Sequence, residues 1–397
     1  MSAGHSLGDL LSERLLAATP HPIPARASVV TLEAADAGAW SVQIGTTTMR
    51  LLPQQQTDPD CTIRASESVL RKVVSGHQSG LGAFLEGRLT VRGDLHLALG
   101  LDGIFLERQE RPAHWPRSKQ VTHNGVTTAY LEAGDPQRPT VVMLHGLGAT
   151  NASLLPLIWD IAEDFHVIAP DLIGFGASSK PRQRYTARAF QRWCESFLDS
   201  LQLSKAHFVG NSLGGRVSLE MALVDPGRVE SLSLLCPSPA FRKMRQLAPV
   251  VRLIRPELFA IGMPTTHRMV VEGIRAMFSS PDRLPRPWYD AAADEFIRVA
   301  RSPAARIALG SALREIYLEQ PDGDKGFYTR LSHLEVPALF IWGDRDRLVP
   351  SGFSRHISEV LPRSTCVVME DSGHVPQFEH RERTTALVRE MLVSCTT

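Results

Sequence analysis

The sequence has few cysteines, almost no net charge and no long apolar run, and each of these shortages argues against a class of protein. Its five cysteines are scattered without C-x-x-C spacing, which disfavours both a disulfide framework and a zinc site. A formal net charge of +1 supplies no general field that would hold nucleic acid or an anionic membrane. No apolar stretch approaches the length of a membrane span. We therefore expect reduced thiols, no metal and no nucleic-acid partner.

The N-terminal residues also lack the features of a signal peptide. They read MSAGHSLGDLLSERLLAATPHP, with acidic residues among the leucines and no basic region followed by an apolar core. The leucines are spaced as on one face of a short amphipathic helix. We expect a helix within residues 1–24 and a cytoplasmic location.

The length of the chain favours two domains, and residues 109–120 are the best candidate for the linker between them. This stretch is charged, holds prolines and lacks periodicity. Upstream, residues 25–108 contain several runs that alternate as half-exposed strands do, including residues 95–105, and one helical run, SESVLRKVVSG. This pattern predicts a small α+β domain.

Residues 121–397 alternate strand-like and helical segments, which is typical of a mostly parallel sheet with helices on both faces. Residues 237–333 interrupt this rhythm and are rich in helix formers separated by prolines. We predict that they form a helical cap over the carboxyl edge of the sheet, where ligands bind in open α/β folds. The strand-like runs are TVVMLHG, HVIAPD, AHFVGN, VESLSLLCP, PALFIWGD and TCVVMED.

The segment HFVGNSLGGRVSLEMALVDP, residues 207–226, changes from an apolar strand pattern to a helical one within a few positions. Gly210 and Gly214 remove side chains that would collide at so sharp a bend, which leaves Asn211 and Ser212 at its tip. A serine beside glycines is by itself most often a turn or a helix cap. The rest of the chain must therefore supply the partners that a nucleophilic serine needs.

Those partners follow in the order that this fold requires, serine, acid and histidine. The predicted strand PALFIWGD ends in a loop with Asp344 and Asp346, and the predicted strand TCVVMED ends in a loop with His374. All of these side chains fall at the carboxyl edge of the sheet, beside Ser212. A histidine can act as the base for the serine, and an acid can orient the histidine. The residues alone leave Asp344 as a rival to Asp346.

An oxyanion site is predicted where VVMLHGLGATN ends its strand, at His145 and Gly146. The backbone amides of Leu147 and Leu213 are the two donors we expect to stabilise a tetrahedral oxyanion. We expect His145 to hold this loop by hydrogen bonds and not to act as the base. The nearby DLIGFGASSKP contains G-x-G without the rest of a dinucleotide fingerprint, so no nicotinamide or flavin cofactor is expected.

Residues from about 121 to 395 resemble the α/β-hydrolase superfamily. The resemblance rests on the His145-Gly146 pair, the run DLIGFGAS, the elbow GNSLG, the run GDRDRLVP and the Gly-His pair that ends at His374. In the family the acid lies three residues after the glycine of Gly-x-x-Asp-x-x-Val-Pro, which implies Asp346. The family also implies that a serine at the elbow forms an acyl-enzyme or acts by a related serine-dependent mechanism.

Residues from about 25 to 108 resemble a sterol carrier protein type 2 domain. The resemblance rests on the extended stretch DCTIRA, the helical run that ends at Gly76, and the run FLEGRLTVRGD. Such domains bind fatty acyl chains and other lipids in an apolar tunnel, and the resemblance implies this role here.

Together these features predict a serine hydrolase that cleaves a lipid-like ester or thioester without a cofactor. One alternative is a carbon-carbon bond hydrolase, because GNSLGG with Asn211 resembles the elbow of meta-cleavage-product hydrolases. Another is a lipid carrier that uses the hydrolase body as an inert scaffold. No feature of the sequence indicates an oligomeric state.

The basic run FRKMRQLAPVVRLIRPELF, residues 241–259, suggests a weak contact with a membrane surface. Its arginines and lysine alternate with apolar residues, as in an amphipathic helix that lies on a bilayer. The other interpretation is an ordinary helix with one solvated face.

Overall fold

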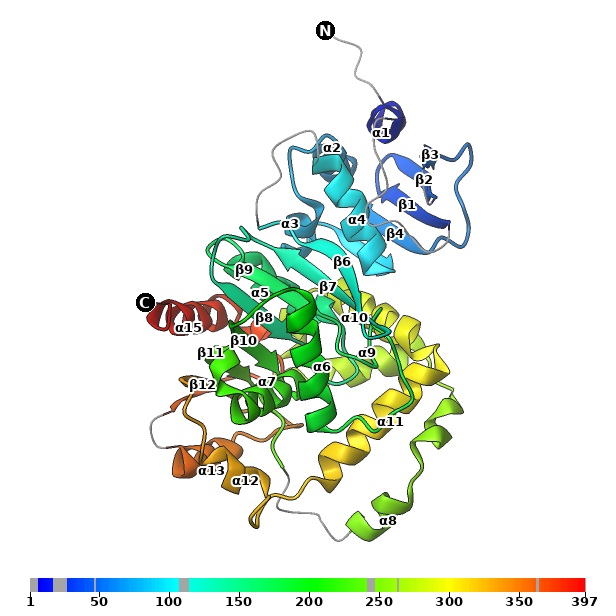
Figure 1. The fold of residues 1–397 in the computed structure, drawn as a ribbon. Helices are drawn as coiled ribbons and strands as arrows, with labels where there is room; N and C mark the ends of the chain where they lie inside the picture. The colour runs from blue at the N-terminus through cyan, green and yellow to red at the C-terminus, as the bar shows by residue number, and fades with distance from the viewer. Residues whose placement is uncertain are drawn as a thin grey trace.

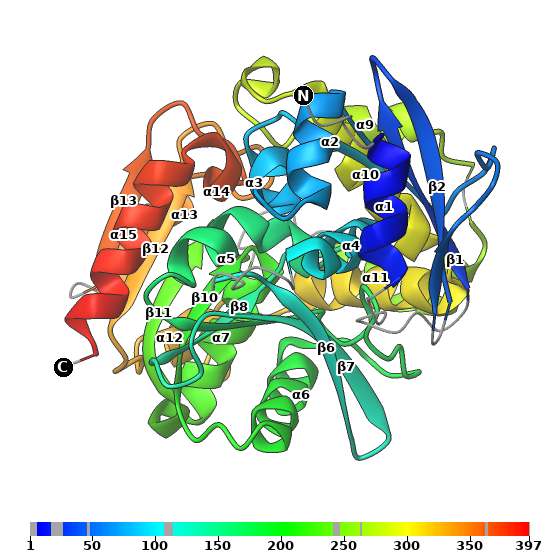
Figure 2. The same ribbon diagram turned by 90° about the horizontal axis from the view of Figure 1, so that it is seen from above.

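The computed structural model of the chain describes residues 6–16, 27–45, 48–106, 114–240, 247–262, 264–361 and 364–396. These residues form an N-terminal domain with a five-stranded sheet and a larger domain with an eight-stranded sheet. The N-terminal domain sits over the edge of the larger one that carries β6 and β7 (Figure 1). Viewed from above, β13 and α15 lie on the opposite side of the molecule from β1 and β2 (Figure 2).

The N-terminal sheet has the order β3-β2-β1-β4-β5, in which only β1 and β4 run parallel. The residues predicted as a strand over 95–105 form the helix α4 instead. Most of its residues are buried, so no polar face marks the helical period, and the alternation in LHLALGL resembles that of a strand. The elements are α1 (Leu7–Leu16), β1 (Ser28–Ala34), β2 (Gly38–Ile44), β3 (Met49–Leu51), β4 (Cys61–Ala65), α2 (Glu67–Val74), α3 (Gly80–Leu85), β5 (Thr90–Gly93) and α4 (Leu95–Leu106).

The helix expected within residues 1–24 is α1, and the rest of that range lies outside the described residues, apart from Ser6. Three of its leucines are buried, on the face that contacts β3 and α2. The predicted helical run SESVLRKVVSG is α2, which begins where the Ser66 side chain accepts a hydrogen bond from the Val69 amide.

The larger sheet has the order β13-β12-β11-β10-β8-β9-β7-β6 and is parallel except for β6 and β7. The predicted linker, 109–120, is wrong at its end, because β6 already begins at Arg117. The missed signal is Asn124-Gly125, whose positive φ angles of 51° and 75° make the tight turn between β6 and β7. The strands are β6 (Arg117–His123), β7 (Val126–Ala133), β8 (Thr140–Leu144), β9 (His166–Pro170), β10 (Ala206–Asn211), β11 (Val229–Leu235), β12 (Ala338–Gly343) and β13 (Thr365–Met369).

Helices cover both faces of this sheet, as the apolar runs predicted. In β8, Val142 and Leu144 pack in the cluster with α6 and α7, while Val141 and Met143 pack in the cluster with α5 and α15. Strands buried on both faces need apolar side chains at every position, which explains their continuous runs. The helices are α5 (Leu155–Ile161), α6 (Ala187–Ser200), α7 (Leu213–Val224), α12 (Phe327–Leu331), α13 (Phe353–Val360), α14 (Pro376–Glu379) and α15 (Arg381–Ser394).

The segment between β11 and β12 forms the predicted helical cap. The single helix expected over the basic run 241–259 is wrong: residues 241–246 lie outside the described part, and Pro256 separates two short helical pieces. No helix among the described residues is both long and apolar enough to cross a bilayer. The cap contains α8 (Ala248–Leu253), the 3₁₀ turn η4 (Pro256–Ala260), α9 (His267–Arg275), the 3₁₀ turn η5 (Pro281–Arg283), α10 (Arg286–Ala300) and α11 (Pro303–Leu318).

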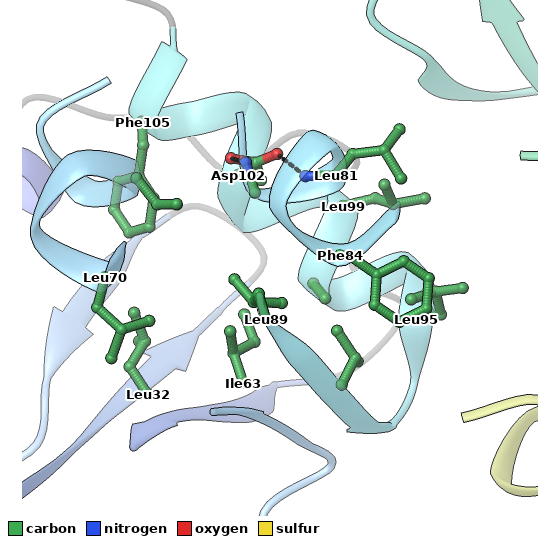
Figure 3. A pocket seen from close by; sticks show the side chains of 14 residues that line it. Leu32, Ile63, Leu70, Leu81, Phe84, Leu89, Leu95, Leu99, Asp102 and Phe105 are labelled. Carbon is green, nitrogen blue, oxygen red and sulfur yellow. Dashed lines mark hydrogen bonds between the residues drawn. The ribbon is translucent and has the colours of Figure 1, made fainter. Parts of the chain in front are cut away.

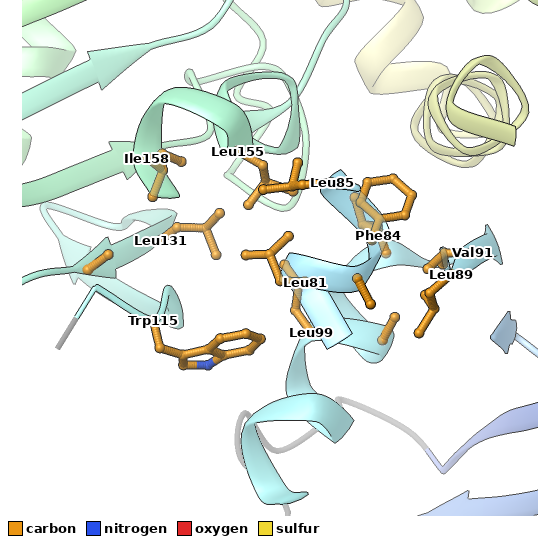
Figure 4. Packing of buried hydrophobic residues seen from close by; sticks show 14 of the residues in the cluster. Leu81, Phe84, Leu85, Leu89, Val91, Leu99, Trp115, Leu131, Leu155 and Ile158 are labelled. Atoms are coloured by element: carbon orange, nitrogen blue, oxygen red, sulfur yellow. The ribbon is translucent and has the colours of Figure 1, made fainter. Parts of the chain in front are cut away.

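The two domains share one apolar core. Leu81 and Leu99 of the N-terminal domain belong to the same buried cluster as Leu131, Leu155 and Ile158 of the larger domain, and Figure 4 shows their side chains facing one another. Polar contacts join β5 to the cap, where the Asp294 carboxylate accepts hydrogen bonds from the Arg92 side chain and the Gly93 amide. The domains therefore form one packed body.

We expect Leu155→Ala to lower the stability of both domains together. Leu155 is 1 % exposed within the shared core, and a truncation of this kind costs about 2–5 kcal/mol. Calorimetry should show one unfolding transition that moves to lower temperature as a whole. Leu16→Ala is the matched control, because that leucine is 89 % exposed. Two separate transitions, of which only one shifts, would contradict a shared core.

Candidate active site

Ser212 lies at a sharp bend between β10 and α7, with a strained backbone of φ 53° and ψ −113°. The bend is possible because the strands and the helix approach closely at glycines. A Cβ atom on Gly214 would lie 2.0 Å from the carbonyl oxygen of Leu144, and one on Gly210 would lie 2.5 Å from the backbone of Gly214. The backbone around the bend is fixed by a hydrogen bond from the Ser212 amide to the Leu235 carbonyl.

The structure brings Asp346, and not Asp344, to His374. The Nδ1 atom of His374 lies 2.7 Å from Oδ2 of Asp346, and both side chains are buried. The other oxygen of Asp346 accepts the amides of Leu348 and Val349 at 2.8 and 2.9 Å. Asp344 is exposed and accepts the amide of Ser372 instead. With Nδ1–H donated to the carboxylate, Nε2 of His374 is left as the basic nitrogen.

Both ring nitrogens of His145 are engaged in the loop after β8. Nε2 accepts the amide of Leu172, so Nδ1 carries the proton and donates it to the carbonyl of Gly146. Burial lowers the pKa of His145, although Asp171 nearby opposes this effect, so the ring is neutral at neutral pH. His145 therefore orients the loop that carries Gly146 and has no free nitrogen to act as a base.

The side chain of Asn211 joins the end of β11 to the loop that carries His374, beside Ser212. Its Nδ2 donates to the carbonyls of Leu235 and His374, at 3.1 and 3.2 Å. Its Oδ1 faces Gly146, where an added Cβ would lie 3.3 Å away and only 3.4 Å from the Cβ of Ser212. Asn211 thus positions the loops on either side of the serine.

The two predicted oxyanion donors lie on these same elements. Leu213 directly follows Ser212 and is the first residue of the twelve-residue helix α7, so its amide belongs to the positive end of the helix dipole. Leu147 follows Gly146 and lines the cavity that contains Ser212.

The glycine-rich loop DLIGFGASSKP is organised around a carboxylate. The oxygens of Asp171, which is fully buried, accept the amides of Asn151 and Ala177 at 2.9 and 2.7 Å. Gly176, with φ 50°, allows this approach, because a Cβ there would overlap the Asp171 carboxyl group. Asp171 thus joins this loop to the segment that begins at Asn151.

Ser212 and His374 open into a cavity of about 660 Å³ whose walls are mainly apolar. The cap supplies much of the wall, including Phe278 and Trp288. Among the described residues of the N-terminal domain, three also line this wall: Phe84, Leu85 and Leu95. The sequence does not predict that they lie at the site. No local signal marks them, because their role depends on contacts between distant parts of the chain, such as the hydrogen bond that joins Trp288 to Phe84 across 204 positions.

Two groups among the described residues have metal-ligand side chains close together. In the first, Cys236 lies beside Asp346 and His374, which bond to each other, and burial raises the pKa of the Cys236 thiol. The second is Asp94, His96 and Glu295, where Arg298 donates two hydrogen bonds to Glu295. Both groups are satisfied by bonds within the protein.

Comparison with known families and proteins agrees with this architecture. Residues 139–381 match the model of the alpha/beta hydrolase fold, and residues 22–106 match the SCP-2 sterol transfer family. The chain therefore belongs to the alpha/beta hydrolase family and carries an SCP-2 domain at its N-terminal end, which confirms both resemblances. It is 26 % identical to Lipase 1 of Psychrobacter immobilis over 66 % of this chain and 79 % of the relative.

A second relative is the dihydrolipoyllysine-residue acetyltransferase component of the acetoin cleaving system of Pseudomonas putida, 27 % identical over 68 % of each chain. Among solved structures, a bacterial membrane phospholipase A superposes with a TM-score of 0.60, 24 % identity and coverage of 83 % of this chain and 96 % of the other. The 2-hydroxy-6-oxo-6-phenylhexa-2,4-dienoate hydrolase of Rhodococcus sp. RHA1 superposes with a TM-score of 0.58, 26 % identity and coverage of 70 % and 98 %.

The strain at the bend predicts how two substitutions of Ser212 differ in stability. Glycine adopts positive φ without steric cost, whereas alanine keeps the Cβ that is strained there. We expect Ser212→Gly to be more stable than Ser212→Ala by about 1 kcal/mol, measured by urea denaturation. Equal stabilities, or a more stable alanine variant, would show that the bend is not strained.

Proposed function

We propose that the protein is a serine hydrolase that cleaves an apolar carboxylic ester or thioester through an acyl-enzyme. The observation that carries the proposal is the buried His374–Asp346 pair, whose histidine lines the same apolar cavity as a serine on a strained bend. The lipase relative and the SCP-2 domain support a lipid-like substrate.

In the proposed cycle, Oγ of Ser212 attacks the carbonyl carbon while Nε2 of His374 takes the hydroxyl proton. The amides of Leu147 and Leu213 stabilise the oxyanion, and Asp346 stabilises the positive charge on His374. The imidazolium then gives its proton to the departing alcohol or thiol, which leaves an acyl group on Ser212. Water enters, loses a proton to His374 and attacks the acyl carbon. The acid leaves, and Ser212 regains its proton from His374.

The first test is the nucleophile itself. We expect Ser212→Ala to lower kcat/KM for aryl esters by at least about 10⁴-fold, because the covalent step is removed. A fluorophosphonate probe should label the wild type at Ser212 and leave the variant unlabelled. A wild type that does not react would favour the alternative of a lipid carrier on an inert scaffold, and full activity in Ser212→Ala would contradict the mechanism.

The second test separates the two neighbouring acids. We expect Asp346→Asn to lower kcat about 10³- to 10⁴-fold, since an amide no longer holds His374 in the productive tautomer. Asp344→Asn is the matched control, because the exposed Asp344 does not contact His374, and we expect it to stay within about threefold of wild type. The reverse order of effects in steady-state kinetics would assign the acid to Asp344.

The second candidate function is hydrolysis of a carbon-carbon bond. The likeness to the Rhodococcus dienoate hydrolase and the GNSLGG elbow favour it. The hydrogen bonds of Asn211 hold the segments around Ser212 in place. Both kinds of hydrolase need this support, so Asn211 does not decide between them. Assays of a vinylogous diketone beside simple esters separate the two, and turnover of the esters alone would reject this candidate.

We further propose that residues 247–262 contact an anionic lipid surface next to the cavity. Leu253, Leu258 and Ile261 are 83, 60 and 76 % exposed, and the exposed Arg252 and Arg255 lie among them. Such a mixture of exposed apolar and basic side chains suits the interface of a bilayer. In Figure 1 the α8 segment lies at the end of the molecule opposite the N-terminal domain.

This surface is connected to the active site through α11. The Arg314 side chain of α11 donates to the carbonyls of Val251 and Arg252, while Leu313 and Ile316 of the same helix line the cavity. A substrate that leaves the bilayer at α8 would therefore be close to the cavity wall.

Flotation with phosphatidylglycerol vesicles tests the contact. We expect the wild type to float at low salt and less at high salt, because the basic side chains act through screened charges. Leu253→Asp should prevent flotation, whereas Leu16→Asp, at an exposed leucine on α1, should leave it unchanged. Absence of the wild type from the vesicle fraction at both salt concentrations would contradict the proposal.

A further inference from the structure

A second cavity lies inside the N-terminal domain. It has a volume of about 30 Å³ and is lined by apolar side chains such as Leu32 and Ile63, and the carboxylate of Asp102 lies next to it (Figure 3). That carboxylate accepts the amides of Gly80 and Leu81 at the start of α3, at 2.8 and 2.9 Å. A space of this size holds about one water molecule, so this inner cavity is closed to an acyl chain.

Among the residues that the structure describes, two side chains line both the inner cavity and the catalytic cavity. They are Phe84 of α3 and Leu95 at the start of α4, which Figure 3 shows at the same end of the inner cavity. Each of these side chains borders the inner cavity on one side and the catalytic cavity on the other. Together they form a partition between the core of the N-terminal domain and the space that contains Ser212.

Contacts with the cap hold Phe84 in place. Trp288 Nε1 donates to the Phe84 carbonyl at 3.0 Å, and the two rings stack with centroids 6.0 Å apart. Trp288 also contacts the ring of Phe378 edge-on, at 5.9 Å, and Phe378 lies just after His374 in the same wall. The position of the partition is therefore fixed relative to the catalytic groups.

We propose that the Phe84–Leu95 partition limits the length of the acyl chain that the enzyme accepts. An acyl group on Ser212 extends through the apolar cavity toward the N-terminal domain, and its end meets these two side chains. The space beyond them is a distal acyl site that is closed in this structure and opens when the partition is shortened. The inference rests on the proposed ester hydrolysis and adds the residues that set its chain-length preference.

The expected effect follows from burial of methylene groups. Each methylene that leaves water for an apolar site improves binding about fourfold. If the partition stops the acyl chain, methylenes beyond it add no binding affinity in the wild type. Each of them adds about fourfold once the two cavities are joined. Access for two more methylenes would thus raise kcat/KM for a long ester about fifteenfold relative to a short one.

The test is a chain-length series of p-nitrophenyl esters, from acetate to palmitate, with full-length variants whose melting temperatures are also measured. We expect Phe84→Ala and Leu95→Ala to move the optimum to longer chains and to raise the long-to-short ratio of kcat/KM about tenfold or more. Phe84→Leu, a milder truncation, should shift the ratio in the same direction, so a failure of Phe84→Ala to fold does not remove the test.

Leu81→Ala is the matched control. Leu81 belongs to the same helix and is 3 % exposed, but it lines the inner cavity without reaching the catalytic one. Its truncation should destabilise the protein while keeping the wild-type chain-length profile. A wild-type profile in the Phe84 and Leu95 variants, or an equal shift in Leu81→Ala, would overturn the inference. Ser212→Ala is measured in the same series. If that variant is inactive and the Phe84 and Leu95 variants keep the wild-type profile, the role of the partition is rejected while the proposed serine hydrolysis stands.

Discussion

The apolar contact between the N-terminal domain and the hydrolase domain is the interaction on which the shape of the candidate active site depends. Leu85, which also lines the cavity, packs into one buried cluster with Leu131 and Leu155 of the hydrolase domain (Figure 4). Full burial of a leucine contributes about 1.5–3 kcal/mol, so several such residues hold the domains firmly together. Without this contact, Phe84 and Leu85 would leave the cavity and its apolar wall would open to water.

The chemistry and the fit of the substrate have different origins in the chain. The groups proposed for catalysis all come from the hydrolase domain. There the Ser212 amide donates to the Leu235 carbonyl, and the Ser212 carbonyl accepts from the amides of Arg216 and Ser238. These hydrogen bonds maintain a bend that costs about 1–3 kcal/mol in strain. The wall comes from three sources: the hydrolase loops, the cap and the N-terminal domain. The SCP-2 domain therefore lines part of the cavity that contains Ser212, while its own interior is nearly filled.

Much of the hydrolase domain could be predicted from local patterns. Strands buried on both faces produce continuous apolar runs, and the bend at Ser212 requires glycines, so both leave clear marks in the sequence. The choice of Asp346 over Asp344 needed the family pattern, because both acids follow the same strand and local sequence does not show which one is buried. The structure supplies that burial and the bond to His374.

Other features could not be predicted because their causes are not local. The helix α4 is buried on most sides, so its sequence lacks the polar face that reveals a helix. The strand β6 carries charged residues and is largely exposed, so it lacks an apolar strand pattern. It pairs with β7 through a turn that lies beyond the predicted linker. Phe84 and Leu95 look like ordinary core residues in the sequence, and only the packing of the cap against the N-terminal domain gives them a second cavity to line.

The most direct measurement of the central claim, that both domains build one acyl-binding cavity, is a crystal structure of the full chain after reaction with a long-chain alkyl phosphonate. The account predicts phosphorus bonded to Oγ of Ser212 and an alkyl chain that passes Trp288 and ends against Phe84 and Leu95. A chain that runs instead along α9 and α11, past Leu313 into solvent, would contradict it.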